Sequence, residues 1–204
     1  MGGIKMKSTL NRYKDLNELA KTGGIVIFGG EEDVTLPLGE LRQAFGIEEN
    51  MYNRSVVGLS VKNAIEVYKE YVAPLVPETV ILHIGAADME YFTENASAFD
   101  ENYRAFIAYI KAQNKKCRIA VVSFKNDTGN AQIKELNKHL KYIADSEKCE
   151  YGDVTSKKVW NPKSTRDALA FVCSIGGIRF IKNKHPLYDL VKIVYGCEVS
   201  YSAL

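Results

Sequence analysis

The sequence lacks the features that would place the chain in a membrane, in a disulfide-stabilised scaffold or on a nucleic acid. It contains no run of 18 apolar residues, and its first residues form no apolar segment typical of a signal peptide. Its 27 Lys and Arg nearly balance its 25 Asp and Glu, leaving a net charge of +2. Its cysteines, Cys117, Cys149, Cys173 and Cys197, form no CxxC pair. We therefore expect a soluble, cytoplasmic protein with neither a nucleic-acid nor a membrane partner.

The length and composition favour one folded domain. The 204 residues include 46% hydrophobic and 25% charged residues, which is close to the average of globular proteins. Apolar residues at helical spacing, Tyr13, Leu16, Leu19 and Ala20, predict a helix ahead of the first strand. We predict a single domain over residues 1–204, with a core at about 24–196 and an N-terminal helical extension at 8–22.

Three short apolar segments predict buried parallel strands. They lie at 25–28 (IVIF), 80–84 (VILHI) and 119–124 (IAVVSF), and residues 51–57 and 150–154 are weaker strand candidates. Apolar residues at helical spacing occupy 61–72, 99–110 and 133–143 between them, and a final helix is predicted to begin near Pro186. This alternation predicts a three-layer α/β/α sandwich with a five-stranded, mainly parallel sheet of the flavodoxin-like type.

In such a sheet the catalytic and ligand-binding residues lie in loops beyond the carboxyl ends of the strands. Four sequence blocks fall there in order: IVIFGGEED, NRSVVG, ILHIGAAD and NKHP. Together they resemble the conserved blocks of the SGNH hydrolases, the GDSL esterase and lipase family. The resemblance extends from Gly24 to Tyr195. It implies acyl transfer by a serine, a histidine and an aspartate, with an oxyanion hole made by two backbone amides and an asparagine.

The residues at these positions depart from the family pattern. The resemblance assigns Glu31 to the nucleophile and to one oxyanion-hole amide, Gly58 to the oxyanion-hole glycine, and Ala87 to the position of the oxyanion-hole asparagine. His185 matches the general base, whereas Lys182 occupies the aspartate position. The remaining residues predicted to line the pocket are Gly30, Asn53, Asp88, Tyr91 and Lys182.

Two functional hypotheses follow. The first is a catalytically degenerate SGNH-like protein that binds a small-molecule or acylated-sugar ligand, because a carboxylate and an alanine replace groups that the chemistry needs. The second is an active esterase, deacetylase or acyltransferase with a relocated nucleophile, for which Ser60, Cys173 and Ser174 are candidates. Ser60 could instead cap a helix that begins at Val61.

The other polar residues predict no cofactor and no metal site. Glu31 and His185 are expected to form an ion pair that favours the imidazolium. His83 lies in an apolar strand and is expected to be a core residue, whereas His139 is expected to be solvated. The run Glu31 to Asp33 lacks both the GxGxxG spacing and the P-loop lysine of nucleotide-binding loops.

Overall fold

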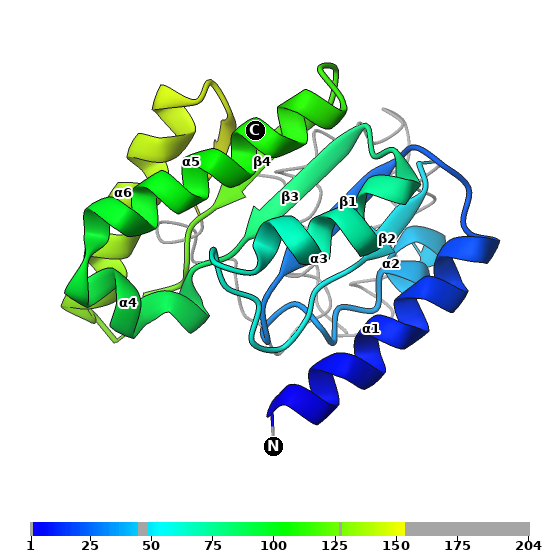
Figure 1. The fold of residues 1–204 in the computed structure, drawn as a ribbon, viewed down its shortest axis with the longest axis horizontal. Helices are drawn as coiled ribbons and strands as arrows, with labels where there is room; N and C mark the ends of the chain where they lie inside the picture. Colours follow the sequence, from blue (N-terminus) through cyan, green and yellow to red (C-terminus); the bar gives the residue numbers. More distant parts are fainter. Residues whose placement is uncertain (1, 45–48, 127, 154–204) are drawn as a thin grey trace, which may run out of the picture.

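A computed structural model describes residues 2–44, 49–126 and 128–153 of the chain. Its centre is a five-stranded sheet formed by β1 (Ile25–Gly29), β2 (Met51–Asn53), β3 (Thr79–His83), β4 (Arg118–Val122) and β5 (Glu150–Gly152). The spatial order is β2-β1-β3-β4-β5, and every neighbouring pair is parallel (Figure 1). The predicted sheet is confirmed, with Ile25, Ile81 and Val121 on its three central strands.

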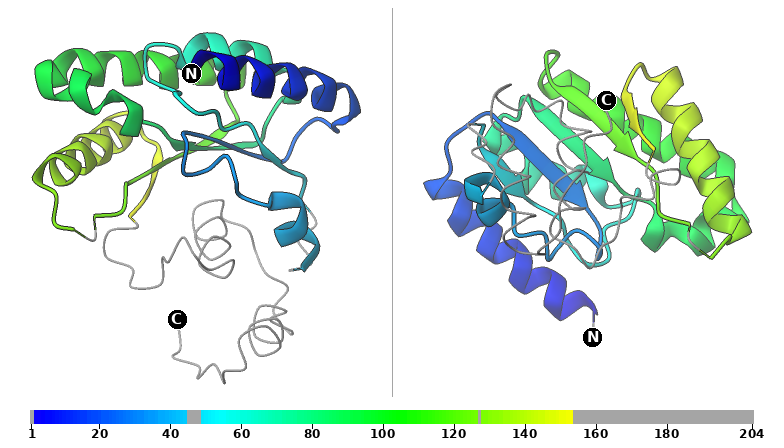
Figure 2. Two further views of the ribbon diagram at one scale, coloured as in Figure 1. Left: turned by 90° about the horizontal axis from the view of Figure 1, so that it is seen from below. Right: turned by 180° about the vertical axis from the view of Figure 1, so that it is seen from behind.

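Helices cover both faces of this sheet (Figure 2). On one face lie α1 (Gly2–Leu19), α3 (Ala64–Tyr71) and α5 (Ala96–Gln113), and on the other lie α2 (Leu38–Ala44) and α6 (Ala131–Ser146). The short helix α4 (Met89–Glu94) packs against α5, and single 3₁₀ turns, η1 (Ala73–Leu75) and η2 (Ala86–Asp88), flank β3. Within the described ranges, no helix combines the length and apolarity that crossing a bilayer requires.

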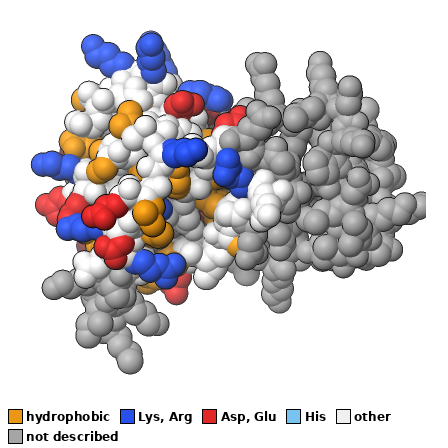
Figure 3. All heavy atoms as spheres, turned by 90° about the vertical axis from the view of Figure 1, so that its right-hand side faces the viewer, with side chains coloured by type: hydrophobic (Ala, Val, Ile, Leu, Met, Phe, Trp, Pro, Cys, Tyr) orange, Lys and Arg blue, Asp and Glu red, His pale blue; other side chains and the backbone are white. Residues whose placement is uncertain are grey.

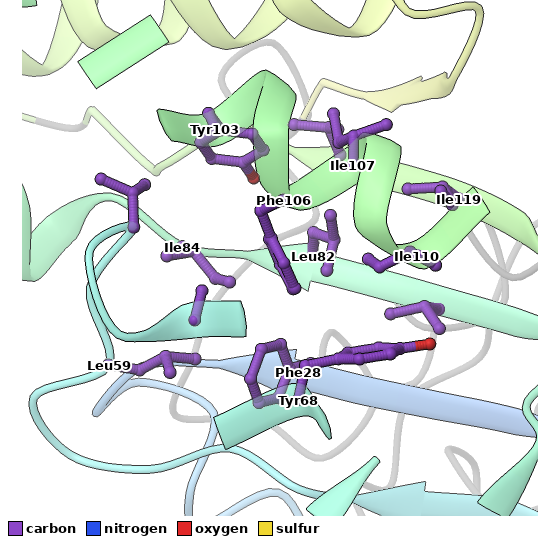
Figure 4. Close-up of a cluster of buried hydrophobic side chains, with 14 of the residues drawn as sticks. Phe28, Leu59, Tyr68, Leu82, Ile84, Tyr103, Phe106, Ile107, Ile110 and Ile119 are labelled. Carbon is purple, nitrogen blue, oxygen red and sulfur yellow. The ribbon is translucent and has the colours of Figure 1, made fainter. Parts of the chain in front are cut away.

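The core lies between the sheet and helices α3 and α5 (Figure 4). Phe28 of β1 contacts Tyr68 of α3 and Phe106 of α5, with ring centroids 5.9 and 5.8 Å apart. All three rings are almost completely buried. Burying side chains of this size contributes about 1.5–3 kcal/mol each, which fixes the two helices over the central strands.

Capping side chains explain where helices α5 and α6 begin. The Asn95 side chain accepts a hydrogen bond from the Ala98 N–H, and the Asn130 side chain accepts from the Gln132 and Ile133 N–H groups. Such caps satisfy amides that have no partner inside the helix.

Several predicted boundaries were wrong. The helix predicted over 61–72 is α3, which begins at Ala64. Strand β2 ends at Asn53 rather than at residue 57. Helices α2 and α4 were not predicted. The predicted final helix near Pro186 lies outside the described residues, as do the strand residue Val154 and the predicted core beyond it.

Candidate functional site

Three loops meet at the carboxyl edge of the sheet. They follow β1, β2 and β3, and because β1 lies between the other two parallel strands, the three loops are neighbours. Hydrogen bonds join them: the Val56 N–H donates to the Gly29 carbonyl at 3.0 Å, and the Gly29 N–H donates to Ser55 Oγ at 3.0 Å. Glu31, Gly58 and Ala87, one from each loop, are therefore carried on a single connected edge.

The turn after β1 presents Glu31 to solvent. Glu31 is exposed and forms no hydrogen bond or ion pair with another described residue. Below it, the Asn53 side-chain amide donates to the Asp33 carbonyl at 2.7 Å, while its oxygen accepts from the Ser55 N–H at 2.9 Å. Asn53 was predicted to line the pocket. Its side chain connects the turn that contains Glu31 with the loop that contains Gly58.

A buried ion pair lies beneath the same turn. His83 Nδ1 is 3.0 Å from Asp33 Oδ2, and the two side chains are only 4% and 3% exposed. The Phe124 ring stacks on the imidazole at a centroid distance of 4.3 Å. Burial disfavours the imidazolium, but the charge and hydrogen bond of Asp33, helped by Glu32 and the Ser123 backbone, outweigh it and raise the pKa of His83.

The position of Gly29 explains how the pair is accommodated. A Cβ atom at residue 29 would lie 2.0 Å from Asp33 Oδ2, so only a glycine allows the carboxylate to reach His83. The prediction that His83 is a core histidine is confirmed by its burial. Its partner Asp33 was not predicted from the sequence.

The loop after β2 contains Gly58, the residue that the sequence resemblance assigns to the oxyanion hole. Gly58 is exposed and has a φ of 79°, a left-handed conformation that favours glycine. The Ser60 N–H donates to the Asn63 side chain at 2.9 Å, and α3 begins only after Asn63. The expectation that Ser60 caps a helix at Val61 is therefore wrong, because residues 61–63 form a turn.

The loop after β3 carries Ala87 and Asp88 on η2. Ala87 is exposed, and its methyl group cannot donate a hydrogen bond. Asp88 is buried and accepts the Val61 N–H at 3.1 Å, which links this loop to that of Gly58. Burial raises the pKa of Asp88 to about 6, although the Val61 hydrogen bond and the charge of Lys62 oppose the shift.

Tyr91 borders this loop as a half-buried aromatic residue. Lys62 Nζ lies 3.5 Å from the centroid of its ring, a cation–π contact, and its hydroxyl accepts a hydrogen bond from Asn102 at 2.9 Å. His139 differs from its prediction, because it is part-buried and pairs with Asp100 at 2.9 Å.

The described loops bring together five of the predicted site residues. These are Gly30, Glu31, Gly58, Ala87 and Asp88, with Asn53 beneath them and Tyr91 beside them. His185 and Lys182, as well as the alternative nucleophiles Cys173 and Ser174, lie outside the described residues. Over the ranges that the structure describes, no three His, Cys, Asp or Glu side chains are grouped to hold a metal ion.

The strand order, the parallel sheet and the site edge define an α/β/α sandwich of the flavodoxin-like type. Comparison with solved structures shows that the fold is that of the SGNH/GDSL hydrolases. A candidate platelet activating factor from Streptococcus pneumonia superposes with a TM-score of 0.69 at 17% identity, covering 86% of this chain and 93% of that one. A GDSL-like lipase from Bacteroides thetaiotaomicron gives a TM-score of 0.58 at 17% identity, covering 92% and 95%.

The same fold is found in an acetylxylan esterase. Axe2, an acetylxylan esterase from Geobacillus stearothermophilus, gives a TM-score of 0.59 at 14% identity, with 80% of this chain and 99% of that chain covered. No model of a known family and no curated protein matches the sequence. At these identities the likeness establishes the fold alone.

Proposed function

We propose that this chain is a catalytically degenerate SGNH-fold protein that binds an acylated small molecule or sugar without ordinary serine-esterase chemistry. One observation carries the proposal: the loops of the SGNH site present Glu31 where the family has its serine, and Ala87 where it has an oxyanion-hole asparagine.

The expected loss of activity is large. Removing one oxyanion-hole donor slows acyl transfer by about 10²–10³, and removing a nucleophile costs still more. The Glu31 carboxylate adds a negative charge beside the place where the oxyanion would develop, and this repulsion opposes the oxyanion. Together these effects argue against serine-esterase catalysis with residue 31 as the nucleophile and residue 87 as an oxyanion-hole donor.

The features that this edge retains support the proposal that it binds a ligand. Gly58 keeps its left-handed conformation, Asn53 and Asp88 hold the loops in place, and Tyr91 supplies an aromatic surface. The acetylxylan esterase with the same fold motivates acetylated xylo-oligosaccharides as the first ligands to test. A cytoplasmic location and the absence of nucleic-acid and membrane partners remain predictions.

The experiment compares the wild type with variants that restore the family's groups. We expect the wild type to bind acetylated xylo-oligosaccharide in calorimetry but to leave it, and p-nitrophenyl acetate, unhydrolysed. Glu31→Ser with Ala87→Asn and Lys182→Asp should gain ester turnover of at least roughly tenfold over background, because it regains a nucleophile and a donor. His185→Ala in this triple variant is the matched control and should abolish the gain.

Two results would overturn the proposal. Wild-type turnover that His185→Ala abolishes would show an active enzyme, and loss of that turnover in Ser60→Ala would identify the relocated nucleophile. Absence of both turnover and binding across acetylated sugars and short-chain esters would exclude the proposed ligand class.

A further inference from the structure

A cavity of about 430 Å³ lies at the outer edge of the sheet and shares Asn53 with the framework of the candidate site. Its walls come from α1, from the segment between β1 and the first turn of α2, and from the edge strand β2. Leu16, Leu36, Leu38 and Met51 make it apolar, and its volume is within the roughly 300–1,000 Å³ of small-molecule sites. Figure 3 shows the face at the right of Figure 1, where hydrophobic side chains lie among both basic and acidic ones.

Arg54 lines this cavity as a buried cation. The residue is only 4% exposed, and within the described ranges no carboxylate lies within ion-pair distance of it. Its guanidinium donates from Nε and Nη2 to Asn17 Oδ1, at 3.0 and 2.7 Å, and from Nη1 to the Asn53 carbonyl at 2.9 Å. Both acceptors are neutral, so the three hydrogen bonds do not compensate the charge.

The aromatic rings around Arg54 hold the guanidinium in place. Its carbon lies 5.0 Å from the Tyr13 ring centroid and 5.5 Å from that of Tyr52. Burial lowers the pKa of Arg54, which is the expected sign for a cation without a counter-ion. A buried charge of this kind is costly unless an anion pairs with it, and a guanidinium is well matched to a carboxylate.

The cavity lining is positive as well as apolar. Arg12 contributes a second guanidinium, and among the described residues that line the cavity none is acidic. We propose that the cavity binds a small amphipathic carboxylate, with its head group on Arg54 and its hydrocarbon chain against Leu16, Leu36 and Met51. The proposed head-group and chain contacts, Arg54, Leu16, Leu36 and Met51, are not among the predicted site residues, so the proposal does not depend on whether that site is catalytic.

Calorimetry with sodium decanoate tests the proposal, and 1-decanol and decyltrimethylammonium serve as probes with the same chain and a different head group. We expect saturable binding of decanoate and at least roughly tenfold weaker binding of the other two, because only decanoate can neutralise Arg54. All probes are used below the concentration at which they form micelles.

Two variants locate the ligand. Arg54→Gln should weaken decanoate binding by at least roughly tenfold, and because this residue is buried its folding is checked by circular dichroism. Leu16→Asp should also weaken binding, since it places a competing carboxylate in the cavity at a position that is 40% exposed and tolerates a charge. Val76→Asp, at an exposed apolar residue outside the cavity, is the matched control and should bind decanoate like the wild type.

Absence of saturable decanoate binding to the wild type would overturn the proposal. Equal binding of decanoate and 1-decanol, or binding that Leu16→Asp leaves unchanged, would also overturn it. Glu31→Ser should leave decanoate affinity unchanged, so the result is independent of the ester assays.

Discussion

Replacing Asp33 with asparagine should destabilise the protein more in acid than at alkaline pH. In the wild type the pKa of His83 is raised, so the pair contributes its full stability below the unfolded pKa of about 6.5 and loses it as pH rises through the folded pKa. In Asp33→Asn the effect of burial is opposed only by the weaker contributions of Glu32 and the Ser123 backbone, so the pKa of His83 falls. The folded variant then requires a neutral ring and loses stability as pH falls.

The magnitude follows from the burial of the pair. With side chains only 4% and 3% exposed, water cannot solvate an imidazolium that has lost its partner, and leaving such a charge unpaired costs about 3–5 kcal/mol. Once the pH has risen through the folded pKa the ring is neutral and an asparagine oxygen can still accept its Nδ1–H, so the loss then falls to about 1–2 kcal/mol. The larger loss is a substantial part of the roughly 5–15 kcal/mol typical of a domain.

Urea unfolding followed by circular dichroism between pH 5 and 9 measures the difference. Asp100→Asn is the matched control, because it removes a carboxylate from His139 in a pair whose side chains are 27% and 14% exposed. Its loss should not exceed about 1 kcal/mol at any pH in this range, since water reaches this pair. A loss in Asp33→Asn that is the same at pH 5 and pH 9 would refute the reasoning, because the imidazole would then be neutral in the wild type.

Three further predictions concern the same framework. Gly29→Ala should lower the free energy of unfolding in urea by about 3 kcal/mol, because the new methyl group displaces Asp33 from His83. At Gly30 an added Cβ would meet nothing within 4 Å, so Gly30→Ala should lower it by less than about 1 kcal/mol. Equal losses in the two variants would contradict the assigned clash. Asp88 has a folded pKa of about 6, above its unfolded value, so its ionisation should reduce wild-type stability by about 1–3 kcal/mol as pH rises from 4 to 7. Asp88→Asn should remove that part of the pH dependence, and an unchanged pH profile of the unfolding free energy would show that Asp88 does not cause it. Phe106→Ala should cost about 3–5 kcal/mol, because the buried ring contacts aromatic side chains of both the sheet and α3, and a loss below about 1 kcal/mol in thermal unfolding would contradict the described core.

The central strands could be predicted from sequence because burial on both faces makes them continuously apolar. Ile25 to Phe28 and Val80 to Leu82 are such segments, and the structure places them side by side. The edge strands β2 and β5 carry polar residues, so their ends were less well defined. Helices α2 and α4 have only seven and six residues, which is too short for a helical period to stand out.

The candidate site was predicted from block order, which locates loops but not the contacts beneath them. The sequence contains a signal for the His83–Asp33 pair: a histidine inside an apolar strand needs a partner, and acidic residues follow the neighbouring strand. Arg54 gave no comparable signal, because its partner Asn17 lies on the N-terminal helix, which was predicted to be an extension outside the core. Such contacts depend on which loops the sheet makes neighbours, so pattern alone does not predict them.

Helix α1 has a consequence for any attempt to shorten the protein. Its Tyr13 hydroxyl donates to the buried Ser55 carbonyl at 2.7 Å, and its Asn17 side chain both accepts from Arg54 and donates to the Tyr71 carbonyl at 3.0 Å. A truncation that begins at residue 22 would remove these partners and leave the Ser55 carbonyl and the Arg54 guanidinium facing a void or water. The smallest unit that folds stably therefore includes α1, and proteolytic cleavage between α1 and β1 should leave the two fragments associated rather than release the helix.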